Sequence, residues 1–210
     1  MTKTFIIITF ILVLCSCSTG RQPDKAVISY DSIQKIISSG KNENFLPLRD
    51  SSKINRQLMQ QLTSILKVDQ GPRDFRKDSS IVAEVTNIID KNGWLGVDIV
   101  GHLGNMTLFL VIQHADINVQ EKYLPIMRQA VLNGKAEARA LAFLEDRHLL
   151  RHGKKQFYGS QVDYDKKTGK PILAPIEDEP NVNNRRISIG LEPLEEYLKQ
   201  WGIIYKPSTK

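Results

Sequence analysis

Residues 106–112 read MTLFLVI and are apolar except for Thr107. An apolar run of this length is typical of either a buried strand or part of a buried helix, and its periodicity does not separate the two. The run can be extended over residues 103–114, which is longer than most strands, although Gly104 and Asn105 weaken a helical interpretation. We therefore predict a central, buried helix over residues 103–114.

Two amphipathic helices are predicted before this run. The first has apolar residues at helical spacing after Ser51 and Ser52, either of which can act as its N-cap, and Gly71-Pro72 ends it. The second carries an apolar stripe over residues 81–89 and is stopped by Asn92-Gly93.

Two more helices are predicted after the run. Asn118 is placed to cap the first of them, with Glu121 at the N3 position completing a capping box, and Asn133-Gly134 ends it. We expect Pro125 to kink this helix. The second spans residues 135–152, and the short link between the two predicts an antiparallel helix pair.

The pattern changes after Gly153. Residues 156–164 and 171–176 flank a hydrophilic turn, which predicts a β-hairpin or an extended ribbon. A last helix is predicted to have Pro193 at its first position and to end before Gly202.

The predicted fold class is therefore mostly α, within an α+β arrangement. We expect a single compact multi-helix domain over residues 51–205 with one small β-hairpin near residues 156–176. A domain of this length can bury a hydrophobic core without disulfides.

The first residues resemble an export signal. Lys3 supplies a positive charge ahead of an apolar stretch that is too short to span a bilayer, which needs about 20 residues. The leader ends in LCSC over residues 14–17, which resembles the lipobox of bacterial lipoproteins and makes Cys17 the residue expected to be lipidated. We predict a lipoprotein signal peptide over residues 1–16 and a flexible tether over 17–50, with an ordinary signal peptide as the alternative.

This leader predicts that the protein is located in the cell envelope and that a membrane is its partner. Lipidation of Cys17 anchors the chain to a membrane of the bacterial cell envelope, and Ser18, which is not an acidic retention signal, favours the outer membrane. The net charge of +6 suits an anionic ligand or surface, but the Lys and Arg residues are scattered, so no nucleic-acid partner is predicted. Both cysteines lie at the leader boundary, and the chain lacks phosphate-loop, nucleophile-elbow and two-cysteine zinc patterns. No cofactor and no metal is therefore predicted.

A charged pair, Asp146-Arg147, lies in the predicted helix over residues 135–152. The positions three and four residues from Asp146 are all apolar, so its carboxylate is expected to face the core or the wall of a pocket. A buried carboxylate needs a partner, and Arg147 can pair with another acid through a bidentate contact. The pair either orients a ligand or belongs to a buried salt-bridge network.

His114 is the candidate general base. It ends the apolar run within the sequence QHAD over residues 113–116, so the carboxylate of Asp116 lies two residues away. The alternative is that Asp116 caps the following helix and His114 the preceding one. His148 and His152 have the spacing of a metal-binding pair, but no third ligand is implied nearby, and exposed histidines at a helix end are favoured.

Residues 156–161 read QFYGSQ and concentrate two amides, a phenol and a hydroxyl. This composition indicates a polar site or a network with internal partners. If the stretch is a strand, Gln156 and Tyr158 share one face and are the pair expected to meet a ligand, while Gln161 secures the ribbon to the helices. Further on, Arg185-Arg186 can bind an anion or lie in an exposed basic loop.

In their order, these motifs resemble an uncharacterised bacterial family that is known only as a domain of unknown function. The resemblance covers about residues 55–200 and rests on Asp69, Gln70 and Arg73; Trp94, Val100 and Gly101; Gln113, His114, Ala115, Asp116 and Gln120; Asp146 and Arg147; Gln156, Tyr158, Gly159 and Gln161; and Arg185, Arg186, Gly190, Leu191, Pro193 and Leu194. The chain departs from the family pattern at Ser160, where the family has threonine. The resemblance implies a shared fold and a shared polar site, and it implies no activity.

Three functions are compatible with these residues. In the first, the exported domain binds a polar or anionic ligand, using Asp116, Arg147, Gln156, Gln161 and Arg186. In the second, the same pocket belongs to a hydrolase or transferase with three catalytic residues: the base His114, the acid Asp146 and the phenol of Tyr158. In the third, the polar set is a buried hydrogen-bond network that specifies the fold.

Overall fold

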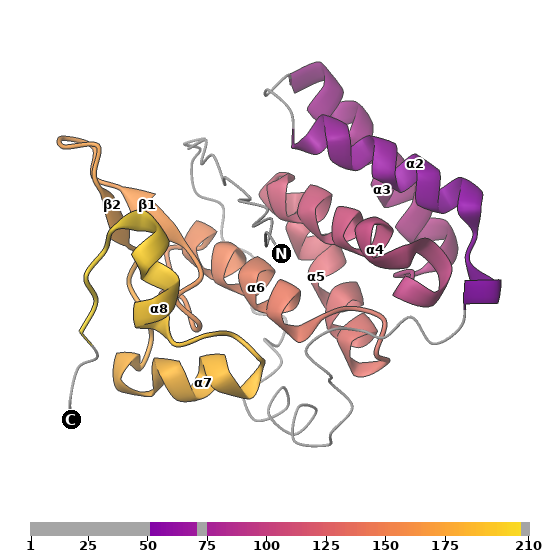
Figure 1. Ribbon diagram of the computed structural model, residues 1–210. Coiled ribbons are helices and arrows are strands. Elements are labelled where there is room, and N and C mark those ends of the chain that lie inside the picture. The colour runs from indigo at the N-terminus through magenta and orange to yellow at the C-terminus, as the bar shows by residue number, and fades with distance from the viewer. Residues whose placement is uncertain (1–50, 71–74, 207–210) are drawn as a thin grey trace, which may run out of the picture.

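The computed structural model describes residues 51–70 and 75–206, so the predicted leader, the tether and the lipidation site at Cys17 lie outside the described residues. Within them the chain forms seven α-helices and one two-stranded sheet, which confirms the predicted class, mostly α with a small hairpin (Figure 1). None of these helices is long and apolar enough to cross a membrane.

Five long helices come first and short elements follow. The long helices are α2 (Arg56–Asp69), α3 (Phe75–Asn92), α4 (Val97–His114), α5 (Ile117–Leu132) and α6 (Ala138–Arg151), preceded by the 3-10 turn η1 (Ser51–Lys53). The short elements are β1 (Val162–Tyr164), β2 (Pro171–Leu173), η2 (Glu179–Asn181), α7 (Val182–Ser188), α8 (Leu194–Leu198) and η3 (Lys199–Trp201). Helix α4 lies among α2, α3, α5 and α6, and α6 runs from this bundle toward the C-terminal elements (Figure 1).

Helix α4 is the central helix that the apolar run predicts, but it begins at Val97 rather than near residue 103. Its backbone turns at Gly101, where φ is 68° and ψ is 175°, a conformation that other residues rarely adopt. At Gly104 a Cβ atom would lie 2.8 Å from Val100 Cβ and 3.3 Å from Leu62 Cδ1 of α2. The glycine that weakens the helical interpretation is therefore the residue that lets α2 and α4 pack closely.

Two helix caps differ from the sequence prediction. Asn55, and neither Ser51 nor Ser52, caps α2 by accepting a hydrogen bond at 3.0 Å from the backbone N–H three residues ahead. Asp116, and not Asn118, caps α5 in the same way, also at 3.0 Å, which confirms the alternative interpretation of Asp116 as a capping residue. Both capping residues have extended backbone angles, which place the side-chain oxygen over the first helical turn.

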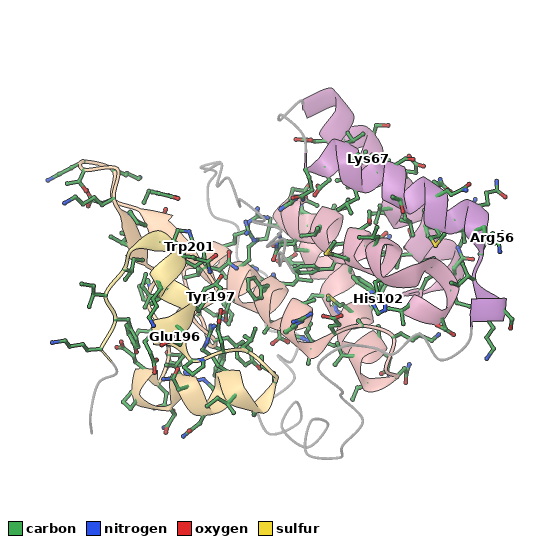
Figure 2. All side chains as sticks on the ribbon, viewed as in Figure 1. Arg56, Lys67, His102, Glu196, Tyr197 and Trp201 are labelled. Atoms are coloured by element: carbon green, nitrogen blue, oxygen red, sulfur yellow. The ribbon has the colours of Figure 1, made fainter. Side chains whose placement is uncertain are left out.

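A second apolar core lies beneath the C-terminal elements. Strands β1 and β2 pair antiparallel with Val162 opposite Leu173. Tyr197 of α8 packs edge-on against Trp201, with ring centroids 4.8 Å apart (Figure 2). It also packs edge-on against Phe143 of α6, with centroids 6.0 Å apart. Phe143 packs against both apolar cores and therefore joins the helical bundle to the C-terminal elements.

The residues Arg185-Arg186 lie in α7, so the interpretation of this segment as an exposed basic loop is wrong. Their side chains are 2% and 0% exposed. A guanidinium group can be buried in this way only if hydrogen-bond acceptors surround it. Those acceptors are mainly backbone carbonyls of the stretch 156–161 and of segments that lie near it in space.

Candidate functional site

The stretch 156–161 is irregular and is not a strand. Gln156 forms an isolated parallel bridge with Ile176, and the regular ladder begins only at Val162. Gly159 has a φ of 68°, and a Cβ atom there would lie 2.9 Å from Leu194 Cδ1. The alternation of faces expected for a strand therefore does not apply to these residues.

Asp146 holds this stretch by its backbone. Its carboxylate accepts hydrogen bonds from the N–H groups of Phe157 at 2.7 Å, Tyr158 at 3.0 Å and Ser160 at 2.9 Å. The side chain is fully buried, and this burial raises the pKa of Asp146, while the N–H donors of Ser160 and Tyr158 act in the opposite direction. Three converging donors make this carboxylate the anchor of the stretch.

The two glutamines continue the same network. Gln156 Nε2 donates to the carbonyls of Gln161 at 3.0 Å and Ala174 at 2.8 Å, and Gln156 Oε1 accepts the N–H of Gln161 at 2.9 Å. Gln161 Nε2 donates to Ser160 Oγ at 3.1 Å and to the Phe143 carbonyl of α6 at 3.4 Å. Both amides are therefore engaged with the chain itself.

Arg186 completes the network from α7. Its Nε and Nη1 donate to the carbonyls of Glu192 and Tyr158, both at 2.7 Å. The guanidinium lies over the ring of Tyr197, 4.6 Å from the centroid, and burial lowers its pKa. We call Asp146, Gln156, Gln161 and Arg186 the Asp146 network. All four side chains form hydrogen bonds with backbone groups of the stretch 156–161 or of the segments packed around it.

His114 pairs with a carboxylate from a different helix. Its Nδ1 lies 2.9 Å from Asp69 Oδ1 and 3.0 Å from Asp69 Oδ2. These are the last residues of α4 and α2, and their side chains are 12% and 1% exposed, respectively. A hydrogen bond from Nδ1–H to a buried carboxylate fixes the ring orientation and makes Nε2 the basic nitrogen.

The other predicted site residues lie in three different environments. The carboxylate of Asp116 caps α5 on an exposed residue. The side chain of Tyr158 is 2% exposed and belongs to the main apolar core. Arg147 is half-buried on α6, and Asp146 beside it points to the stretch 156–161. The structure therefore separates the predicted set into the Asp146 network and a region around His114.

Basic residues of α6 extend the region around His114. Arg151 Nη1 donates to the Ala115 carbonyl at 2.7 Å, which places its guanidinium next to the residue that follows His114. Arg147 lies one helical turn before Arg151 on the same face of α6. Basic side chains near a helix C-terminus are also favoured by the helix dipole, so their presence alone does not indicate a ligand. We call Asp69, His114, Arg147 and Arg151 the His114 site.

Two fully buried amides border this site. Gln120 Nε2 donates to the Gln113 carbonyl at 2.6 Å, and both side chains are 0% exposed. Both polar atoms of the Gln113 amide, and Oε1 of Gln120, have no hydrogen-bond partner in the part of the chain that the structure describes. A buried amide without a partner costs about 1–3 kcal/mol, so such groups call for a bound molecule or another explanation.

His148 and His152 show no metal site. Their rings lie 4.5 Å apart edge-on, and His152 Nε2 lies 3.0 Å from Glu121 Oε1. Burial, followed by the nearby His152, lowers the pKa of His148 to about 4, which keeps this imidazole neutral at ordinary pH. Among residues 51–70 and 75–206, no three His, Cys, Asp or Glu side chains are grouped as metal ligands would be.

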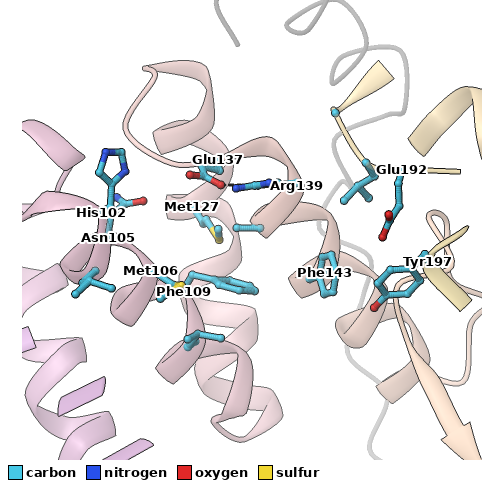
Figure 3. A pocket seen from close by; sticks show the side chains of 15 residues that line it. His102, Asn105, Met106, Phe109, Met127, Glu137, Arg139, Phe143, Glu192 and Tyr197 are labelled. Atoms are coloured by element: carbon cyan, nitrogen blue, oxygen red, sulfur yellow. Dashed lines mark hydrogen bonds and ion pairs between the residues drawn. The ribbon is translucent and has the colours of Figure 1, made fainter. Parts of the chain in front are cut away.

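A cavity of about 670 Å³ adjoins the Asp146 network through Phe143, Glu192 and Tyr197, which Gln161 and Arg186 contact (Figure 3). Its walls come from α4, α5, α6, residues 190–192 and Tyr197. Neither His114 nor any residue of the stretch 156–161 lines it. The sequence prediction missed this cavity because its lining residues are mostly ordinary apolar side chains from distant segments.

The prediction also missed the partner of His114. Asp69 stands out in the sequence only next to Gln70 and Arg73, and 45 positions separate it from His114. No local pattern connects the ends of α2 and α4, so only the packing of these two helices reveals the pair.

The comparisons with known proteins identify a family. No curated protein and no solved structure matches the chain. A family match covers residues 54–207, which include the Asp146 network, the His114 site and the cavity. The chain belongs to DUF6624, a family of unknown function.

Proposed function

We propose that this chain is a lipid-anchored domain of the bacterial cell envelope that binds an anionic ligand at the His114 site. The proposed anchor is a lipid on Cys17, supported by the lipobox-like sequence LCSC and the short apolar leader. Because Ser18 is not acidic, the outer membrane is the favoured location. The tether over residues 17–50 would give the domain reach above the membrane.

The observation that carries the ligand proposal is the bond from Arg151 to the Ala115 carbonyl. This 2.7 Å contact brings a guanidinium to the end of α4, where Asp69 already orients His114. An anion placed there would meet cationic donors from α6 and an imidazole held in one orientation. The net charge of +6 favours the approach of such a ligand.

In this proposal the Asp146 network has a supporting role. Asp146 and Arg147 are adjacent on α6, so a carboxylate that fixes the stretch 156–161 also fixes the neighbouring helix face. Gln156, Gln161 and Arg186 act on the ligand only through the backbone they hold. Asp116 acts by starting α5 immediately after the His114 site.

The test is calorimetric titration of the chain with inorganic phosphate, pyrophosphate and citrate. We expect salt-dependent binding of at least one of them, weakened at least tenfold in Arg151→Gln. Lys167→Gln in the exposed hairpin turn is the matched control, since it removes the same charge far from α6. Failure of all three anions to bind, or equal weakening in the two variants, contradicts the proposal.

A hydrolase or transferase is the second candidate, and the Asp69–His114 pair favours it. A carboxylate on Nδ1 is the arrangement that orients a histidine general base. Of the two residues expected to stabilise developing charge, Tyr158 is buried in the apolar core, which leaves Arg147 of α6 for this role. Hydrolysis of p-nitrophenyl phosphate and p-nitrophenyl acetate is the first assay. We expect His114→Gln to abolish turnover and Asp69→Asn to reduce it, whereas Asp163→Asn leaves it unchanged.

A purely structural role for the same residues is distinguished by stability. If His114, Tyr158 and Arg147 serve only the fold, each single replacement should lower the free energy of unfolding by about 2 kcal/mol or more. A binding or catalytic role predicts small losses or gains, because functional residues are rarely optimised for stability. Urea unfolding of His114→Gln, Tyr158→Phe and Arg147→Gln measures the difference, and large losses in all three contradict both site proposals.

A further inference from the structure

The cavity of about 670 Å³ has walls that are mainly apolar. Met106 and Phe109 of α4, Met127 of α5 and Phe143 of α6 line it (Figure 3), as does Leu191 from the segment after α7. Two methionines in one wall give a surface that adapts to the shape of its occupant. The volume is in the range of small-molecule sites.

Four of the polar side chains around this cavity, those of Asn105, Glu137, Arg139 and Tyr197, have partners within the chain. The Asn105 amide donates to two backbone carbonyls, each at 2.7 Å. The Tyr197 hydroxyl donates to the Ser160 carbonyl at 2.8 Å, and Arg139 Nε lies 2.7 Å from Glu137 Oε2. A peptide or nucleotide in the cavity would bring polar groups that find few free partners. A hydrocarbon chain has no such requirement.

The charged residues at the mouth discriminate between lipid head groups. Glu137 and Glu192 supply two carboxylates and Arg139 one guanidinium (Figure 3). The excess negative charge disfavours an anionic head group and is compatible with a zwitterionic one that presents an ammonium group.

We infer that this cavity binds the hydrocarbon chain of a zwitterionic membrane lipid. The hydrocarbon lies against Met106, Met127 and Phe143, and the head group stays at the mouth near Glu192 and Arg139. This site is separate from the His114 site and does not depend on an anionic ligand binding there.

The test uses the side-chain methyl signals of methionine. The chain has four methionines, and Met106 and Met127 line the cavity, whereas Met59 on α2 lies against Gly101 of α4 and is not part of the lining. The Cys17→Ser chain, which cannot carry its own lipid, is labelled with ¹³C-methyl methionine and titrated with dodecylphosphocholine below its micelle concentration. We expect the signals of Met106 and Met127 to shift and that of Met59 to stay. Phosphocholine without the tail should shift none of them.

Two variants locate the binding. Ala140→Phe places a ring in the cavity wall and should weaken binding of dodecylphosphocholine at least tenfold, while Ala83→Phe on the exposed face of α3 should not change it. If Ala140→Phe unfolds the chain, the inference is tested by the methionine methyl shifts of the Cys17→Ser chain alone. Absence of a Met106 and Met127 shift, or an equal shift of Met59, overturns the inference. It is also overturned if the lipidated wild-type chain shows both signals already shifted without added lipid, because its own acyl chain is then the occupant.

Discussion

The Asp146 carboxylate lies 3.0 Å from the backbone nitrogen of Tyr158, so two residues that the sequence groups as catalytic candidates are joined through the backbone. The same carboxylate accepts from Phe157 and Ser160, and α6 thereby fixes the stretch 156–161. A polar cluster in a sequence can thus serve an irregular buried segment, whose N–H groups lack the partners that a helix or sheet supplies.

The first prediction concerns the loss of this anchor. Asp146→Asn keeps the shape of the side chain but turns one acceptor oxygen into an NH₂ donor that faces backbone N–H groups. We expect the free energy of unfolding to fall by about 2–4 kcal/mol, measured by urea unfolding. Asp163→Asn on β1 is the control and should change it by less than about 0.5 kcal/mol. A loss in Asp146→Asn no larger than that of the control would show that the network contributes little to stability.

The second prediction concerns pH. Glu145 pairs with Arg128 at 2.9 Å, yet burial outweighs this pairing and raises the pKa of Glu145 to about 7. The folded chain therefore holds a proton on Glu145 that the unfolded chain has released, so this group lowers the free energy of unfolding as pH rises from about 4.5 to about 7. His148, whose pKa burial lowers to about 4, acts in the opposite direction over much of this range, so the Glu145 contribution is measured as a difference in urea unfolding between the wild type and a variant, and it amounts to at most about 1.4 kcal/mol per pH unit.

Glu145→Gln tests the assignment, because the amide cannot titrate. Relative to this variant, the wild type should become less stable as pH rises through this range, whereas relative to Glu196→Gln on the exposed side of α8 it should not. The same slope in the wild type and in Glu145→Gln would assign the pH dependence to another group.

Much of the helical fold follows from local patterns, while the ends of the helices do not. The run over residues 106–112 predicts a buried helix, yet α4 starts at Val97, because a glycine at position 101 can continue the chain through a non-helical turn. Asp116 and Asn118 are both suitable capping residues by type. The choice of Asp116 depends on the extended backbone that follows α4, which a sequence pattern does not contain.

The partners of polar residues are harder to predict, because they come from distant segments. The sequence indicates that Asp146 is buried, since its helical neighbours are apolar, but not that three N–H groups from the stretch 156–161 surround it. The burial of Arg186 is equally hard to predict. An arginine is usually an exposed cation, but the carbonyl groups of Tyr158 and Glu192 accept its hydrogen bonds and make its burial possible. Such partners become visible only when the elements are packed.

The third prediction concerns the membrane anchor. If Cys17 is the lipidated residue, Cys17→Ala should abolish incorporation of an alkyne-labelled fatty acid and release the chain from the membrane fraction. Cys15→Ala is the matched control, because it removes a thiol two positions away and leaves the lipobox cysteine in place. Labelling that persists in Cys17→Ala, or that is lost equally in both variants, contradicts the assignment.

The fourth prediction separates backbone strain from crowding at Gly159. Gly159 and Gly169 have nearly the same φ, 68° and 66°, so an alanine at either position meets the same unfavourable left-handed conformation, worth about 1–2 kcal/mol. At Gly159 the added Cβ would also lie 2.9 Å from Leu194 Cδ1 and 3.0 Å from Ile176 Cδ1, whereas nothing lies within 4 Å at Gly169.

Gly159→Ala should therefore destabilise the chain by about 1–3 kcal/mol more than Gly169→Ala, because overpacking adds to the strain. Urea unfolding of both variants gives the difference, and equal losses would mean that Leu194 and Ile176 move aside at little cost. Leu194→Ala combined with Gly159→Ala refines the comparison. If crowding against Leu194 is the cause, the double variant should lose less stability than the sum of the two single variants.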